Sequence, residues 1–148
     1  GDLPRYLRIP KLGVNARVKR LGVKSNNDLQ SPSNIYDVGW YDGSAKPGEG
    51  SAVVIDGFAS GSTNRGVFYS IANLQPGDPI SVERGDGKVI TYKVVSTKKY
   101  DNDTIDMDAV LSPVEKGKGG LNLVTAPGGF DIKTNKFQPR LVIFAVQT

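Results

Sequence analysis

The sequence predicts a mainly β protein that closes into an antiparallel or mixed barrel. Its 148 residues include 18 glycines and 9 prolines, a composition that favours many short strands and turns over long helices. Apolar segments recur at short intervals with Gly or Pro turns between them, a spacing typical of barrels and not of parallel βαβ units. Because a chain of this length with a hydrophobic content of 38% can bury one core, residues 1–148 are expected to form a single domain.

The first half of the chain is predicted to supply short strands. Residues 6–10 alternate in polarity and stop at a proline, as an edge strand does, and residues 13–18 form the next strand. Smaller elements are expected to follow: a turn at 25–28, an isolated strand pair at 29–32, a helical turn at 34–37 and a strand at 38–41. Residues 52–55 are apolar throughout, which predicts a central strand covered on both faces.

The second half is predicted to add one helix and four strands. Residues 67–71, which follow a loop rich in Gly, Ser and Asn, are expected to form a short helix. Strands at 80–83 and 89–95 form a hairpin, because Asp86-Gly87 between them is a strong turn signal. After a polar connection, two buried strands joined by a Gly-rich loop close the domain, with Arg140 at the start of the second.

The distribution of charged residues and the absence of cysteine and histidine exclude several classes of function. The net charge is +4, but the basic residues are scattered and no aromatic platform is interleaved with them, so nucleic-acid binding is not expected. The chain has no cysteine, which excludes disulfides and thiolate metal sites, and no histidine. The acidic stretch 101–108 fails the EF-hand pattern, because its sixth and twelfth positions are Asp106 and Ser112. A solvated loop in which an Asp caps a short helix is expected there, and neither a metal nor a cofactor is predicted.

No apolar run is long enough for a transmembrane helix, and no signal peptide is recognisable. The chain begins at Gly1-Asp2, a few residues before its first predicted strand. We therefore expect it to be one domain of a longer parent protein, to which any N-terminal membrane anchor belongs.

Five segments carry a family resemblance through their order along the chain. They are Ile9-Pro10-Lys11-Leu12-Gly13-Val14, Val38-Gly39-Trp40-Tyr41 with Pro47-Gly48-Glu49-Gly50, Ala52-Val53-Val54-Ile55-Asp56-Gly57-Phe58, Gly66-Val67-Phe68 with Gly77-Asp78, and Leu123-Val124-Thr125-Ala126 with Arg140. In this order they resemble the landmarks of sortases, the cysteine transpeptidases that attach proteins to Gram-positive cell walls or polymerise pili. Each segment alone is weak evidence for the resemblance. Their shared order, which extends over nearly the whole chain, is strong evidence for it. The resemblance is closest to the compact branches often called classes D, E or F.

The resemblance implies an eight-stranded β-barrel with short helices and a groove in which three family positions meet. The family's catalytic cysteine falls at Ala126, its histidine at Phe58, and the arginine that steadies the oxyanion or orients the substrate at Arg140. The substrate-groove residues that it implies are Thr125, Asp56, Ser60 and Phe68. It also implies a sorting-signal-like peptide or a surface protein as partner, at the extracellular face of the cytoplasmic membrane.

The chain as written is predicted to be catalytically inactive. The family's chemistry needs a thiolate that attacks a peptide carbonyl and an imidazole that moves the proton, and neither Ala126 nor Phe58 supplies these groups. Ser60 and Ser62 have no histidine as base, strand alternation turns Thr125 away from the face of position 126, and no spacing singles out a Ser-Lys pair, so hydrolysis by a substitute nucleophile is the least favoured option. Arg140 is either a peptide-binding residue or a strand-end arginine paired with a carboxylate.

Three interpretations of this loss stay open. The first is a natural pseudo-sortase that keeps a peptide-binding groove. The independent losses of the catalytic cysteine and histidine, and the absence of histidine from the whole chain, favour this interpretation. The second is an engineered variant of an active sortase that cleaves a sorting signal and transfers it to an amine; Cys→Ala is a usual exchange for that purpose, whereas His→Phe is not. The third is a structural or interaction module of the cell surface.

Overall fold

The computed structural model describes residues 2–22, 36–58, 66–100, 107–125, 130–131, 136–137 and 140–148. The strands are β1 (Pro4–Ile9), β2 (Val14–Leu21), β3 (Val38–Tyr41), β4 (Ala52–Gly57), β5 (Pro79–Arg84), β6 (Val89–Tyr100), β7 (Gly120–Thr125), β8 (Phe130–Asp131), β9 (Lys136–Phe137) and β10 (Arg140–Gln147). The helical elements in these residues are the 3₁₀ helices η1 (Pro10–Leu12) and η2 (Ile71–Asn73) and the α-helix α1 (Met107–Val110).

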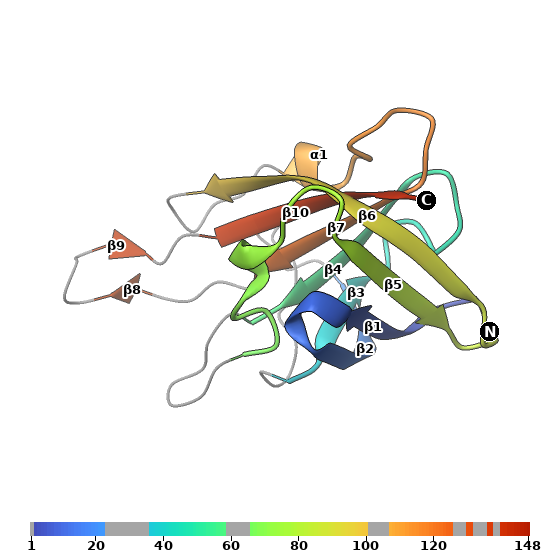
Figure 1. The fold of residues 1–148 in the computed structure, drawn as a ribbon, viewed down its shortest axis with the longest axis horizontal. Coiled ribbons are helices and arrows are strands. Elements are labelled where there is room, and N and C mark those ends of the chain that lie inside the picture. Colours follow the sequence, from blue (N-terminus) through green and yellow to red (C-terminus); the bar gives the residue numbers. More distant parts are fainter. Residues whose placement is uncertain are drawn as a thin grey trace.

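A closed barrel dominates the fold (Figure 1). Its eight strands follow the order β1-β2-β3-β4-β7-β10-β6-β5. The pairs β2–β3 and β4–β7 are parallel and the other neighbouring pairs are antiparallel. The predicted fold class, a mainly β, closed eight-stranded barrel with short helices, is confirmed. The ribbon of β8 and β9 projects from the barrel between β7 and β10, where the sequence predicted only a loop.

The strand β4 is the central strand that residues 52–55 predicted. All of its residues are buried, and it lies between β3 and β7. Val53 and Ile55 belong to the core cluster inside the barrel, whereas Val54 belongs to a second apolar cluster. Because both faces of β4 are covered, its sequence shows no alternation of apolar and polar residues.

The predicted hairpin of β5 and β6 is also confirmed. The two strands pair antiparallel from Pro79↔Lys93 to Glu83↔Val89. Gly87 in the turn has a φ of +88°, a conformation that glycine adopts without strain, and its N–H donates to the Arg84 carbonyl at 2.9 Å. The Asp-Gly signal in the sequence therefore marks the turn correctly.

The short helix predicted at residues 67–71 is wrong in type and position. The N–H groups of Tyr69 and Ile71 donate to carbonyls three residues back, at 3.1 and 3.3 Å, and only Ile71–Asn73 forms a helix, which is 3₁₀. In such turns residues three apart lie on the same side. Phe68 and Ile71 are both buried in the core of the barrel, so burial of this pair accounts for the tighter turn.

Several predicted features lie outside the described residues. They are the turn at 25–28, the strand pair at 29–32, the start of the helical turn at 34–37, Ser60, the acidic residues of 101–106, and Ala126 with the Gly-rich loop that follows it. Tyr36 and Asp37, the described part of the helical turn, form a bend.

Candidate functional site

Three strand ends meet at one end of the barrel. Gly57, the last residue of β4, pairs with Thr125, the last residue of β7, in parallel register. The antiparallel strand β10 begins at Arg140 beside the same end of β7 (Figure 1). Phe58 follows Gly57 in the sequence, and Ala126, outside the described residues, follows Thr125. The topology thus brings Phe58 and Arg140 to the end of the strand that leads into position 126.

Arg140 is buried at this end of the barrel. Its exposed fraction is 0%, and its Nε donates to the carbonyl oxygen of Thr125 at 2.9 Å. In return, the backbone N–H of Leu141 donates to Thr125 Oγ1 at 2.8 Å. The hydroxyl and the carbonyl of Thr125 therefore both join the end of β7 to the start of β10, and the guanidinium is held by a charge-assisted hydrogen bond.

Six outward-pointing side chains of β4, β7 and β10 form one surface, which we call the strand face. It consists of Val54, Asp56, Asn122, Val124, Arg140 and Val142. The three valines belong to the second apolar cluster, while Ile55, Leu123 and Ile143 between them fill the barrel, as strand alternation requires. The strand face combines an apolar floor with three polar side chains. Each of the six residues is at most 1% exposed.

Part of the strand face is covered by residues 109–113, the end of α1 and the turn after it, which we call the cover segment. Val110 is 0% exposed and packs in the cluster of the three valines. Asn122 Nδ2 donates to the carbonyl of Val110 at 2.6 Å and to that of Ser112 at 2.9 Å. Pro113 lies over Gly120, where an added Cβ would meet the Pro113 Cα at 3.3 Å. The cover segment is therefore attached to β7 at two places.

The remaining predicted groove residues lie on different sides of the sheet. Asp56 belongs to the strand face, whereas Phe68 is 1% exposed inside the barrel. Phe68 supports the end of β4 from within, because its N–H donates to the carbonyl of Phe58 at 2.9 Å. Its ring lies so close to Gly57 that an added Cβ would meet it at 2.9 Å. Phe58 is partly buried, and Ser60 lies outside the described residues.

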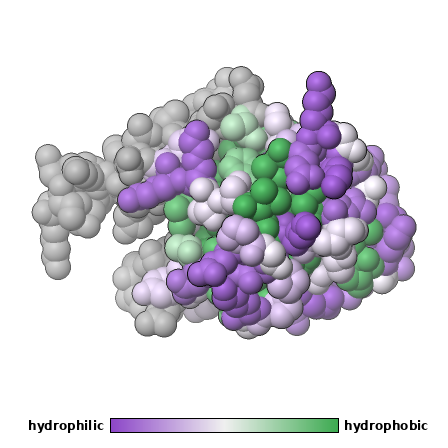
Figure 2. Space-filling model, turned by 45° about the horizontal axis from the view of Figure 1, so that its top comes forward, coloured by the Kyte–Doolittle hydropathy of each residue, from purple (hydrophilic) through white to green (hydrophobic). Residues whose placement is uncertain are grey.

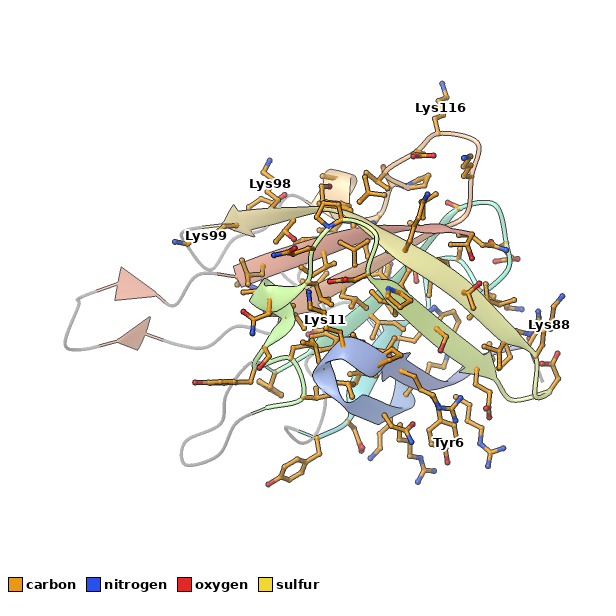
Figure 3. All side chains as sticks on the ribbon, in the orientation of Figure 1. Tyr6, Lys11, Lys88, Lys98, Lys99 and Lys116 are labelled. Carbon is orange, nitrogen blue, oxygen red and sulfur yellow. The ribbon has the colours of Figure 1, made fainter. Side chains whose placement is uncertain are left out.

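Two exposed lysines lie near the same end of the barrel. Lys98 and Lys99 precede Tyr100, the last residue of β6, which pairs with Arg140 (Figure 3). Lys98 Nζ lies 5.1 Å from the centroid of the Tyr100 ring, a cation–π contact.

Shifted pKa values occur elsewhere in the molecule. A hydrogen bond from the Lys11 ammonium at 2.9 Å, with one from the Gln75 N–H, lowers the pKa of the Asp78 carboxyl. Burial in the core raises the pKa of Tyr92 to about 12. Over the described ranges, no three His, Cys, Asp or Glu side chains gather closely enough to hold a metal ion.

Figure 2 shows hydrophobic residues gathered near the middle of the visible surface, with hydrophilic residues around them. The large hydrophobic side chains exposed among the described residues come from separate elements: Tyr36, Tyr69, Val89 and Leu111. Leu111 is 36% exposed, whereas its neighbour Val110 is buried, so the cover segment has one face toward β7 and one toward solvent. No helix in the described ranges has the length and apolar content needed to cross a membrane.

Sequence reasoning missed Asn122 and the cover segment. A signal was present, because Asn122 is a polar residue in the otherwise apolar run 121–124, and a polar side chain on a buried strand needs a hydrogen-bond partner. Its partners are the backbone carbonyls of Val110 and Ser112, which no sequence pattern indicates.

Comparison with known proteins gives a family and a set of related folds. The family model described as a sortase domain matches residues 7–148. Sortase A from Corynebacterium diphtheriae is 21% identical, with a TM-score of 0.70, over 99% of this chain and 60% of that one. Sortase C-1 from Actinomyces oris is 19% identical, with a TM-score of 0.72, over 97% of this chain and 72% of that one. Clostridium perfringens sortase C, solved with the C-terminal cell wall sorting motif, is 21% identical, with a TM-score of 0.68, over 100% of this chain and 71% of that one. Among curated proteins, no significant match is found.

Proposed function

Because this chain belongs to the sortase family, we propose that it is a natural pseudo-sortase, which binds an extended peptide of the sorting-signal type without cleaving it. The observation that carries the proposal is that Arg140 is buried beside the ends of β4 and β7, the strands that lead to Phe58 and Ala126. The domain is proposed to act at the cell surface, at the extracellular face of the cytoplasmic membrane.

Loss of catalysis follows from the residue types. Acyl transfer through a cysteine requires a thiolate, and proton transfer to the leaving amine requires a general acid. The chain contains neither cysteine nor histidine. The alanine methyl at position 126 forms no covalent intermediate, and the ring of Phe58 neither donates nor accepts a proton. The subclass of the domain remains a prediction.

The composition of the strand face supports peptide binding. Ligand sites are usually apolar surfaces with a few polar groups that set the orientation of the ligand. Here the floor is formed by valines, and Asp56, Asn122 and Arg140 supply one carboxylate, one amide and one guanidinium. A guanidinium presents several donors in a plane, which suits carbonyl and carboxylate oxygens of a peptide. The Clostridium perfringens sortase C solved with a sorting motif supports the same ligand class.

The burial of the strand face favours a second candidate, a purely structural or interaction module. Since all six side chains are at most 1% exposed, a peptide reaches them only after the covering residues have moved. In the structural interpretation the covering residues never leave, and the polar groups only hold neighbouring backbone segments together.

Titration of isotopically labelled protein with a Leu-Pro-Ala-Thr-Gly peptide distinguishes these candidates. Binding should shift the backbone resonances of Arg140 and Val142, while Gly87 at the opposite end of β5 and β6 stays unchanged. A scrambled peptide of the same composition serves as the control. If the labelled protein shows no residue-specific shifts up to millimolar peptide, peptide binding is refuted and the structural candidate stands.

A reversion experiment tests the assigned catalytic positions. The double variant Phe58→His with Ala126→Cys should fold and form a thioester with the peptide, detected by mass spectrometry, whereas Phe58→His alone should not. A folded double variant that binds peptide but never acylates would show that further groups of the site have changed. The natural gene decides the origin of the loss: codons for histidine and cysteine at these positions would mean an active sortase disabled by engineering.

A further inference from the structure

We propose that the cover segment is a built-in occupant of the strand face, and that Asn122 both holds it and binds the backbone of the peptide that replaces it. The inference rests on the proposed peptide-binding function. It adds a binding residue outside the three family positions and a competition that sets the affinity.

The cover segment presents to β7 the groups that a bound peptide would present. It places one apolar side chain, Val110, among the valines of the strand face and directs two backbone carbonyls to one side-chain amide. An extended peptide carries the same apolar side chains and the same carbonyls. A peptide on the face of a sheet meets no free strand edge, so it cannot extend the sheet, and the side chain of Asn122 is a partner that this face offers to its backbone.

The amide of Asn122 is incompletely satisfied by the cover segment. Both carbonyl partners are acceptors, so the NH₂ group must point toward them, which fixes the orientation of the amide. Its Oδ1 has no hydrogen-bond partner among the described residues, and the residue is 0% exposed, so bulk water does not reach it either. A buried acceptor without a donor disfavours the covered arrangement. A peptide backbone offers an N–H beside each C=O, so an incoming peptide can satisfy Oδ1 as well as Nδ2.

The secondary structure of the cover segment adds little to its attachment. It belongs to a helix of four residues, which has little stability of its own, and Leu111 beside Val110 is exposed. Among its described side chains, Val110 alone is fully buried. Displacement therefore exposes little apolar surface, and the valines of the strand face are covered again by the peptide.

Three variants separate the two roles of Asn122. Val110→Ser weakens the cover segment and leaves Asn122 intact; Asn122→Ala weakens the segment and removes the peptide-binding amide. Leu111→Ser changes an exposed residue of the same segment and is the matched control. Amide hydrogen exchange at residues 109–112 without peptide reports opening, and fluorescence anisotropy of a labelled Leu-Pro-Ala-Thr-Gly peptide reports affinity.

Both Val110→Ser and Asn122→Ala should exchange about tenfold faster or more at the cover segment, as expected for loss of a buried contact or hydrogen bond. Leu111→Ser should stay within about twofold of the unmodified protein. Val110→Ser should bind the peptide about tenfold more tightly, because less binding energy is spent on opening. Asn122→Ala should show no such gain, because the opened face lacks the amide. If Val110→Ser unfolds, Val110→Ala replaces it.

The outcomes distinguish the inference from the function on which it rests. Equal gains in affinity for Val110→Ser and Asn122→Ala would overturn the peptide-binding role of Asn122. Faster exchange in Val110→Ser without tighter binding would overturn the competition. If the peptide binds to none of the variants, the proposed function fails; the exchange rates of Asn122→Ala and Leu111→Ser then still decide whether Asn122 holds the segment.

Discussion

Replacing Gly57 by alanine should disturb the end of the strand that leads into position 58. An added Cβ would lie 2.9 Å from Phe68 Cδ2 and Cε2 and 3.0 Å from Val67 Cγ1. Contacts of this length are shorter than carbon atoms tolerate, so the ring or the strand must move. Phe68 is 1% exposed in the core and has no open space into which to turn.

The expected magnitude follows from overpacking of a filled core. Inserting one methyl group where neighbours cannot retreat typically destabilises a protein by about 1–3 kcal/mol. For a domain of this size each kcal/mol lowers the melting temperature by about 2–4 °C. Gly57→Ala should therefore melt roughly 2–12 °C below the unmodified protein.

The assay is thermal and urea unfolding followed by circular dichroism, with Gly50→Ala as the matched control. An added Cβ at Gly50 meets no atom within 4 Å, so the same chemical change should be neutral or slightly stabilising there. Phe68→Leu in the Gly57→Ala background should recover part of the loss, because the smaller side chain makes room for the methyl group.

Two results would contradict this reasoning. If Gly57→Ala and Gly50→Ala unfold alike, the close packing under β4 does not limit the strand. If the effects of Gly57→Ala and Phe68→Leu simply add, the two residues are not coupled; contact predicts a coupling energy of about 0.5–3 kcal/mol.

Three further predictions concern buried and paired groups. Arg140→Lys should lower the free energy of unfolding by about 1.5–3 kcal/mol in urea titrations, because an ammonium on a flexible stem does not reproduce the Nε bond to Thr125; an unchanged midpoint would refute this. Tyr92 has its pKa raised to about 12, so the folded state keeps a proton that the unfolded chain loses near pH 10. Stability should fall between about pH 10 and 12, and Tyr92→Phe should reduce this slope in urea midpoints measured across that range. The pKa of Asp78 is lowered mainly by its hydrogen bond from Lys11, so its stabilising effect should be present above the ordinary value of 3.8 and disappear as the pH falls through the folded pKa. Asp78→Asn should therefore flatten the acid side of the melting-temperature profile.

Much of the barrel could be predicted because its strands carry local signals. The Asp-Gly turn of the β5–β6 hairpin and the apolar run of β4 are specified by adjacent residues. The helix predicted at 67–71 failed for the opposite reason. Phe68 and Ile71 are placed by the packing of the barrel core, and that tertiary demand selects a 3₁₀ turn over an α-helix.

The candidate site, too, could be predicted from the sequence only in part. The order of the sequence landmarks predicted that Phe58 and Arg140 come from strands that meet, and the parallel β4–β7 pair with β10 beside it brings them to one end of the barrel. The sequence did not predict that Phe68 lies inside the barrel, because a residue in a turn has no strand alternation to assign its side. Nor did it predict the pairing of Asn122 with the cover segment, which joins residues 10 and 12 positions apart through backbone carbonyls.

The chemistry of the strand face bears on the choice between the two proposed roles. Burial of polar groups generally lowers stability unless every group is paired, and a well-packed apolar replacement is often as stable or more so. A leucine at position 122 would remove the Oδ1 acceptor, which has no partner among the described residues, but it would also leave the carbonyls of Val110 and Ser112 without the Asn122 donor. An asparagine is advantageous when one side-chain amide must form hydrogen bonds with two different backbones in turn. The proposed exchange of occupants accounts for both features of Asn122, the two bonds to the cover segment and the Oδ1 without a partner among the described residues.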